Sequence, residues 1–279
     1  MFKSLVGMGL PPWIYPFLHS VKEEYKNALP PASATPPTEE DKAWIEKNAF
    51  EEDPFDSLKL KRKMSAEYKN NTASLLKQTC ALGTILAISK EPIPPKTWTT
   101  WWHCIRLVVP SKEVRIVFYL HPQTRQLPAK GLPIEAQHIN GGMTMPCDAK
   151  TVIIYRKEEA TRVLLHELFH ASCTDPYEKP QPFIEADCET WAEIALCALK
   201  AKGDVNQFEH LITGQINYAV NQSRYLTLFH GVKTPEDYAW RYTKGRLNVF
   251  EELGFTIPFA PKKPKKPDTL RLTVCEPGS

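Results

Sequence analysis

The chain has 279 residues, of which 42% are hydrophobic and 24% are charged, a composition typical of a globular protein with one sizeable core. The formal net charge of +3 is too small to indicate a nucleic-acid partner by itself. No apolar run approaches the roughly 20 residues that a membrane-spanning helix needs, so we expect no membrane segment.

The seven cysteines and the N-terminus bear on the cellular compartment. An odd number of cysteines, scattered without a CxxC pair, indicates free thiols in a reducing compartment rather than a disulfide framework. Pro11, Pro12 and Pro16 interrupt the apolar N-terminal stretch, and no small-residue cleavage site follows it, which argues against a signal peptide. We therefore expect an intracellular, cytoplasmic protein.

Residues 1–57 are rich in proline and predict a partly extended N-terminal arm. A short helix is expected over 40–50, because Thr38 can cap it and the acidic residues 39–41 suit its first turn. The aromatic side chains between residues 13 and 17 need a surface to pack on, either in this chain or in a partner.

Residues 58–260 are expected to form one domain. Its predicted helices cover 58–70 and 74–89, and the prolines between 91 and 95 end the second of them. A sheet is expected over about 97–156, since three of its stretches are rich in β-branched and aromatic residues: 97–109, 114–120 and 151–156. Helix start and stop signals predict two active-site helices over about 157–200 and a helical lobe over 204–257.

The stretch His166-Glu167-Leu168-Phe169-His170 carries the strongest chemical signal. Residues four apart on a helix lie on one face, so His166 and His170 can bind one metal ion. Glu167 lies beside them, where a carboxylate can take a proton from a water that the metal activates. The strand over 151–156 leads directly into this helix, which we expect to run through the core.

A catalytic zinc site takes three protein ligands, and no third histidine follows soon after His170. The next predicted helix, which begins at Phe183, is instead rich in carboxylates. These are Glu185, Asp187, Glu189 and Glu193. Residue types alone leave the third ligand open among them.

At this point the sequence resembles the gluzincin zinc metallopeptidases, whose HExxH motif is followed by a glutamate on the next helix. Their aminopeptidase branch has 18 intervening residues and a Glu-x-aromatic-Ala-Glu motif, which Glu189–Glu193 fits. The resemblance implies Glu189 as the third ligand. Glu185 stays the rival, because Glu185–Asp187 also resembles the third-ligand helix of some small metallopeptidases; Glu193 or Glu185 would then orient a ligand. Cys188 replaces the asparagine of that branch and its amine-recognition motif is absent, so exopeptidase activity is not implied.

The stretch from His138 to Glu193 is also similar to a group of metallopeptidase-like proteins from large DNA viruses. Besides the HExxH helix, the similarity includes His138–Gly142, Arg156–Glu159 and Glu189–Ala192. It implies a viral protein, which could then be associated with the virion. Together the two resemblances imply an α+β, zincin-like fold, with a small mixed or antiparallel sheet packed on a central HExxH helix and a helical C-terminal lobe after it.

The expected activity is hydrolysis of a peptide or protein substrate with one zinc ion and Glu167 as general base. The substrate backbone is expected to pair with a sheet edge at Asn140, Gly141 and Gly142, because glycines permit close approach; a plain Gly-Gly turn is the alternative. The negative intermediate needs a further donor. Candidates on the helical half are Tyr218, Tyr225, His230, Tyr238, Arg241 and Tyr242.

Two other classes of function stay open. A catalytically silent zincin-fold protein could serve in assembly and bind a partner through the arm or through residues 261–279, a basic, proline-rich tail. A nucleic-acid-binding module using Lys262–Lys266 is less favoured, because such a run is more often a solvated tail.

Overall fold

A six-stranded mixed sheet forms the centre of the molecule, and the chain is of the α+β class. The structure is a computed structural model that describes residues 9–176 and 178–276. The strands lie in the order β1 (Ser33–Ala34), β2 (Ser74–Cys80), β3 (Gly83–Ser89), β4 (Val114–His121), β6 (Val152–Arg156) and β5 (Gly142–Met143). The pairs β3–β4 and β4–β6 are parallel, and the other three pairs are antiparallel. The short strand β5 is therefore one edge of the sheet.

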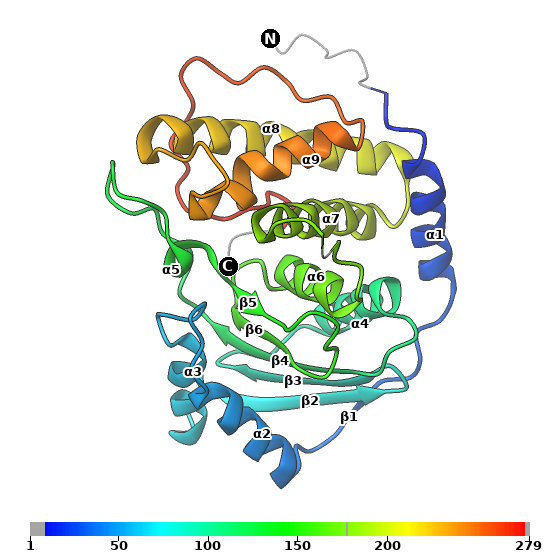
Figure 1. Cartoon of the computed structure of the whole chain (residues 1–279). Coiled ribbons are helices and arrows are strands. Elements are labelled where there is room, and N and C mark those ends of the chain that lie inside the picture. Colours follow the sequence, from blue (N-terminus) through cyan, green and yellow to red (C-terminus); the bar gives the residue numbers. More distant parts are fainter. Residues whose placement is uncertain (1–8, 177, 277–279) are drawn as a thin grey trace.

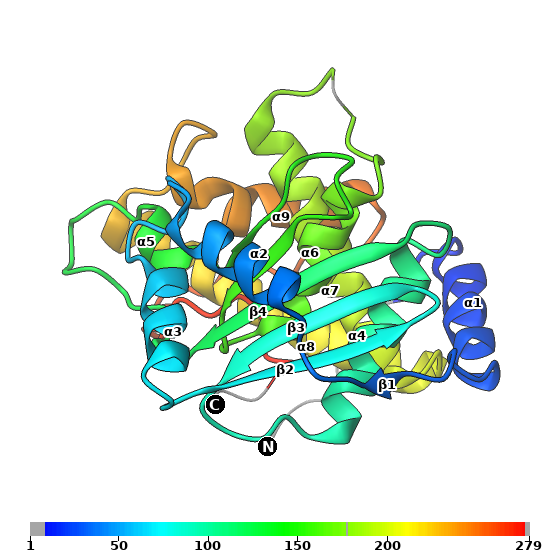
Figure 2. The ribbon, with the colours of Figure 1, turned by 90° about the horizontal axis from the view of Figure 1, so that it is seen from below.

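Helices cover both faces of this sheet (Figures 1 and 2). The helices α2 (Glu39–Phe50) and α3 (Leu60–Lys69) lie on one face, and α4 (Pro95–Val108) and α6 (Ala160–Ala171) lie on the other. Beyond α6 follow α7 (Gln181–Ala201) and then a layer of α8 (Val205–His230) and α9 (Arg246–Glu252). The remaining helices are α1 (Ile14–Lys26), α5 (Ala136–Ile139), a 3-10 turn (Tyr238–Trp240) and a π-helical turn (Arg241–Gly245).

The central strands are buried on both faces because successive side chains point to opposite sides of a strand. Ile116 and Phe118 of β4 pack in the larger core with α4 and α6, whereas Val117 and Tyr119 pack in the smaller core with α2 and α3. This double burial explains why β4 and β6 are near-continuous apolar runs. The predicted strands over 114–120 and 151–156 are confirmed.

Two predicted elements are wrong. Residues 74–89 form the hairpin β2–β3 rather than a helix, and Gly83 at its turn has φ +133 and lies close to the backbone of Val114. Residues 97–109 form helix α4 rather than a strand. Pro95 occupies its first turn, where a proline ring suits the helix, and its tryptophans recur at helical spacing and are buried.

The described part of the N-terminal arm contains the helices α1 and α2, joined by non-helical segments, and it packs on the domain. Within residues 9–57, α1 buries Ile14, Leu18 and Val21 in the larger core, and Trp13 packs against Trp191 with ring centroids 5.3 Å apart. The predicted helix over 40–50 is confirmed as α2, with Thr38 in a capping box. Residues 1–8 lie outside the described part of the chain.

The predicted basic tail also differs from a solvated segment. Lys262, Lys263, Lys265 and Lys266 are exposed, but the chain then returns to the core, where Leu270 and Leu272 are buried. The backbone N–H groups of Leu272 and Thr273 both donate to Glu159 Oε1 at 2.7 Å. The end of the described chain is thereby fixed beneath the start of α6. Residues 277–279 lie outside the described residues.

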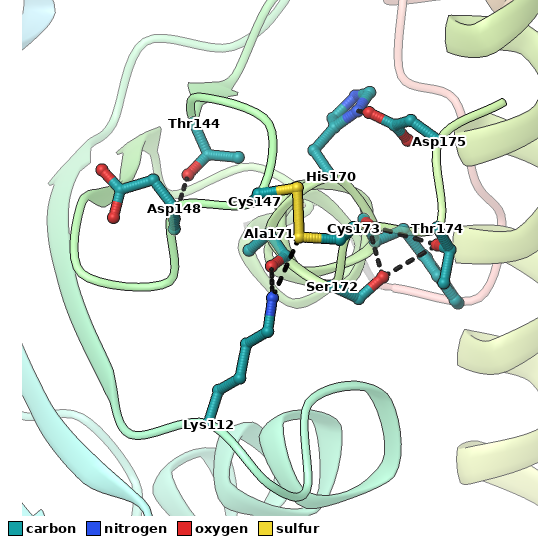
Figure 3. The surroundings of a disulfide bond; sticks show 11 residues. Lys112, Thr144, Cys147, Asp148, His170, Ala171, Ser172, Cys173, Thr174 and Asp175 are labelled. Carbon is teal, nitrogen blue, oxygen red and sulfur yellow. Dashed lines mark hydrogen bonds and ion pairs between the residues drawn. A yellow bond between two sulfur atoms is a disulfide. The ribbon is translucent and has the colours of Figure 1, made fainter. Parts of the chain in front are cut away.

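A disulfide joins Cys147, in the loop after β5, to Cys173, which directly follows α6 (Figure 3). The expectation of free thiols is therefore wrong for this pair. The other cysteines, all within the described residues, are free thiols: Cys80, Cys104, Cys188, Cys197 and Cys275. No helix in the described ranges is long and apolar enough to cross a membrane.

Candidate metal centre

The helix α6 presents both motif histidines on one face. The buried strand β6 leads into it through Glu159, whose φ of 59 reverses the chain before the first helical residue. The rings of His166 and His170 lie one turn apart with centroids 4.7 Å apart, and their Nε2 atoms approach to 3.2 Å. Two imidazole nitrogens that face each other at this distance need a shared cation or proton between them.

The third group at this point is Glu185, on the second turn of α7. Its Oε2 lies 3.5 Å from His166 Nε2 and 3.9 Å from His170 Nε2. The three donor atoms form one of the residue clusters that can hold a metal ion. Ligands about 2.0–2.1 Å from a tetrahedral zinc lie about 3.3 Å from one another, so two nitrogens and one carboxylate oxygen at these separations fit zinc.

The sequence-based preference for Glu189 as third ligand is not supported by this geometry. Glu189 lies one turn further along α7, and its Oε1 is 3.0 Å from Nδ1 of His166, on the opposite side of the ring from Glu185. Its other oxygen is paired with the guanidinium of Arg162. Glu189 therefore lies on the Nδ1 side of His166, away from the point where the two Nε2 atoms meet, and its contact with Nδ1 is a close approach without hydrogen-bond geometry.

The second histidine has a hydrogen-bonded outer partner in Asp175, whose Oδ2 lies 2.9 Å from Nδ1 of His170 (Figure 3). Burial disfavours a charged His170, but the bond to Asp175 outweighs burial and raises its pKa to about 12. A carboxylate behind each histidine leaves both Nε2 atoms pointing inward, as in metal sites where an outer carboxylate fixes the ring. Asp175 was not a sequence-based candidate, because it follows the helix in an irregular loop.

Charge at the centre is unequally distributed. Burial lowers the pKa of His166 to about 4, which keeps this imidazole neutral and able to donate its Nε2 lone pair. Burial alone would raise the pKa of Glu185, but the contacts with His166 and His170 outweigh it and lower the pKa to about 2. His170, with its raised pKa, carries a proton in the metal-free chain and would release it when zinc binds. Two neutral imidazoles and one carboxylate are then a ligand set that zinc accepts.

Glu167 points to the sheet side of the same cavity. Burial raises its pKa to about 8, and the charge of nearby His170 offsets this rise only in part. A methyl group at Gly142 would come within 2.9 Å of Glu167 Oε1 and 2.8 Å of the Ile153 carbonyl oxygen. Gly142 is thus required for the close packing of β5 against Glu167.

These groups line one cavity of about 290 Å³. The predicted substrate residues Asn140, Gly141 and Gly142 lie on its wall, and Gly142 belongs to the edge strand β5. This segment pairs with β6, so it is a sheet edge and not a plain turn. Of the six candidate donors, Tyr238, Arg241 and Tyr242 also line the cavity, whereas Tyr218, Tyr225 and His230 are absent from its lining.

Two buried arginines donate hydrogen bonds to the backbone of this cavity wall. Arg156 donates from Nε to the Asn140 carbonyl at 2.6 Å, and Arg125 donates from Nε to the Ile139 carbonyl at 2.5 Å. Arg125 is in turn paired with Glu158 and with Glu159, the latter at 2.8 Å. Arg156, Glu158 and Glu159 belong to the stretch that resembles the viral proteins, whereas Arg125 lies outside that stretch and was not a sequence-based candidate.

Two further groups of metal-binding residue types are committed elsewhere. Cys188 Sγ lies 3.3 Å from Asp175 Oδ1 and 3.7 Å from His170 Nδ1, behind the histidine. Glu193, near two free cysteines, is paired with Arg162 and accepts from Thr273. Neither group adds a second open position for an ion.

No family model, curated protein or solved structure matches this chain.

Proposed function

We propose that the chain is a zinc-dependent peptide-bond hydrolase of the zincin type, with His166, His170 and Glu185 as the metal ligands. The observation that carries this proposal is the convergence of two Nε2 atoms and one carboxylate oxygen next to Glu167, in a cavity bordered by a sheet edge. A core polar cluster needs no such open wall. An ion bound there would supply Lewis-acid activation of a water and of the substrate carbonyl.

Glu167 is the group that moves the proton. Its carboxylate accepts a proton from the attacking water and delivers it to the leaving amine nitrogen. Burial raises the pKa of Glu167, so its carboxylate takes up a proton readily. Glu167 must be ionised before it can accept that proton, and a metal cation next to it would favour the ionised form. A substrate chain paired with neighbouring β5 would lie against this carboxylate.

The substrate is held as an added strand. The free side of β5 borders the cavity, and an extended peptide can pair its backbone with that edge. Arg125 and Arg156 fix the carbonyl groups that precede β5, so the edge is preorganised before the substrate arrives. A chain held this way crosses the face of Glu167 and the two histidines.

The test is metal analysis combined with a peptide-library digest of the purified full chain. We expect about one zinc per chain and cleavage products that disappear after chelation and return when zinc is added. A chain that binds zinc and cleaves no peptide would instead be the catalytically silent assembly protein, and a chain that binds no zinc would contradict the proposal altogether. The viral resemblance and a virion location are not needed for this test.

A further inference from the structure

Among the described residues, Arg241 is the arginine of the cavity that has no direct ion-pair partner. Three arginines line the cavity, and two are committed: Arg125 pairs with Glu159 at 2.8 Å, and Arg162 pairs with Glu193 at 3.1 Å. In the described ranges, no carboxylate oxygen lies within 4.0 Å of the Arg241 guanidinium, and its buried Nε has no hydrogen-bond partner.

The carboxylates of the cavity are already used. Glu185 faces the two histidines, Asp175 is bonded to His170, and Glu189 is paired with Arg162. Glu167 is the proposed base. Glu185 acts on Arg241 only from a distance, and none of these carboxylates forms a direct ion pair with it. A carboxylate that enters with a ligand could therefore take this direct position.

The position of the guanidinium is set before any ligand binds. Its Cζ lies 4.7 Å from the ring centroid of Tyr238, an arrangement that orients the planar group. Tyr238 is itself fixed, because its hydroxyl donates to Asn140 Oδ1 at 2.6 Å, and Tyr242 donates to the same oxygen at 3.0 Å. Arg241 is therefore tied to the wall where the substrate chain is proposed to lie. It stands at the start of the π-helical turn, a feature frequent at functional sites.

We propose that Arg241 binds a carboxylate of the substrate, so that the cleft selects peptides with an acidic side chain or a free C-terminal carboxylate near the scissile bond. The planar fork of arginine fits such a group with two parallel hydrogen bonds. This inference rests on the proposed function for its placement of the substrate. The two sources of the carboxylate are distinguished by the choice of peptides.

The experiment uses four synthetic peptides built around one site cleaved in the library digest. They carry Glu or Gln beside the scissile bond, and a free or an amidated C-terminus. In the wild-type chain we expect kcat/KM to be about 10- to 100-fold higher for the preferred carboxylate form than for its uncharged partner. In Arg241→Gln the ratio of kcat/KM between the carboxylate form and its uncharged partner should fall to about one.

Lys244→Gln is the matched control, because this exposed residue lies on the same turn and does not line the cavity. It should keep the wild-type preference, and all variants should keep their zinc content and melting temperature. Equal loss on all four peptides would make Arg241 a donor to the reaction intermediate and overturn the inference. A wild-type chain without carboxylate preference would also overturn it and leave the proposed hydrolysis intact.

Binding separates the two proposals if the chain cleaves nothing. Because no cleaved site is then known, the four peptides are built on the fixed sequence Ala-Ala-Phe-Glu-Ala-Ala and carry a fluorescent label. Each is titrated into the zinc-loaded Glu167→Gln chain, and binding is followed by fluorescence anisotropy. Tighter binding of a carboxylate form that Arg241→Gln abolishes would support the subsite even though hydrolysis had failed. Equal binding of all four would reject it.

Discussion

The carboxylate of Glu185 lies 3.5 Å from Nε2 of His166. One helical turn further along α7, Glu189 faces Nδ1 of the same imidazole at 3.0 Å. The ring is thus placed between an inner carboxylate on the side of His170 and an outer one on the side of Arg162. This difference assigns separate roles to two glutamates that share one face of α7.

Replacing these glutamates should have unequal effects on zinc affinity. Glu185→Ala removes a ligand and should weaken zinc binding by more than about a thousandfold, whereas Glu189→Ala removes an outer partner and should weaken it by about 10- to 100-fold. Competition with a chromophoric chelator measures both. Asp187→Ala is the control, since its side chain pairs with Lys179 and does not line the cavity. Equal losses in the two glutamate variants would contradict the assignment.

The contribution of Glu167 to the stability of the metal-free chain should fall as pH rises through a window set by its pKa. Its pKa is raised to about 8 in the folded chain from an ordinary value of 4.5, so folding retains a proton that the unfolded chain releases between these values. Glu167→Gln removes this cost, and its unfolding free energy relative to wild type should grow by up to a few kcal/mol from about pH 5 to about pH 8. Urea unfolding with a chelator measures the difference. A difference independent of pH would contradict the raised pKa.

Reduction of Cys147–Cys173 should loosen the metal centre from one side. The disulfide fixes the loop after β5 to the end of α6, where the Cys147 N–H also donates to the His170 carbonyl at 2.9 Å (Figure 3). Cys147→Ser with Cys173→Ser should lower the unfolding free energy by about 3 kcal/mol and weaken zinc binding. Thermal unfolding with and without reductant measures it, and Cys80→Ser, which breaks no disulfide, is the control. Reductant that leaves the wild-type transition unchanged would show that the bridge is dispensable.

Arg156 should be needed for the shape of the substrate wall. Arg156→Gln leaves the carbonyl groups of Gln137 and Asn140 without their buried donor, at a cost of about 2–4 kcal/mol in stability. Amide hydrogen exchange should increase over residues 137–143 before other segments respond. Arg62→Gln, which loses one exposed bond to Phe50, should stay within about 0.5 kcal/mol of wild type. Uniform exchange in both variants would count against the role of Arg156.

Much of the candidate site could be predicted because its signals are local. The four-residue spacing of His166 and His170 gives one helical face, and the apolar run of β6 identifies the strand before it. The glycines at 141 and 142 indicated a close approach, which the edge strand shows. The sequence could not decide between Glu185 and Glu189 as the third ligand, because residues one turn apart share a face of the helix. The way α6 and α7 cross decides between them.

The errors arose where distant contacts override local pattern. Residues 74–89 have helix-compatible apolar residues, yet Gly83 packs against Val114 and the segment pairs as a hairpin. The aromatic richness of α4 suggested a strand, although its tryptophans fit helical spacing equally well. Glu159 holds backbone groups 113 and 114 positions away, so the buried C-terminal segment left no local signal.

The most direct measurement compares zinc content and peptide cleavage in wild type and Glu167→Gln, prepared in parallel. Glu167 lines the cavity but is outside the three-residue metal cluster, and glutamine keeps its shape. The account predicts about one zinc per chain in both proteins and a loss of at least about a thousandfold in cleavage by the variant. Wild type without zinc, or a variant that cleaves as well as wild type, would contradict it.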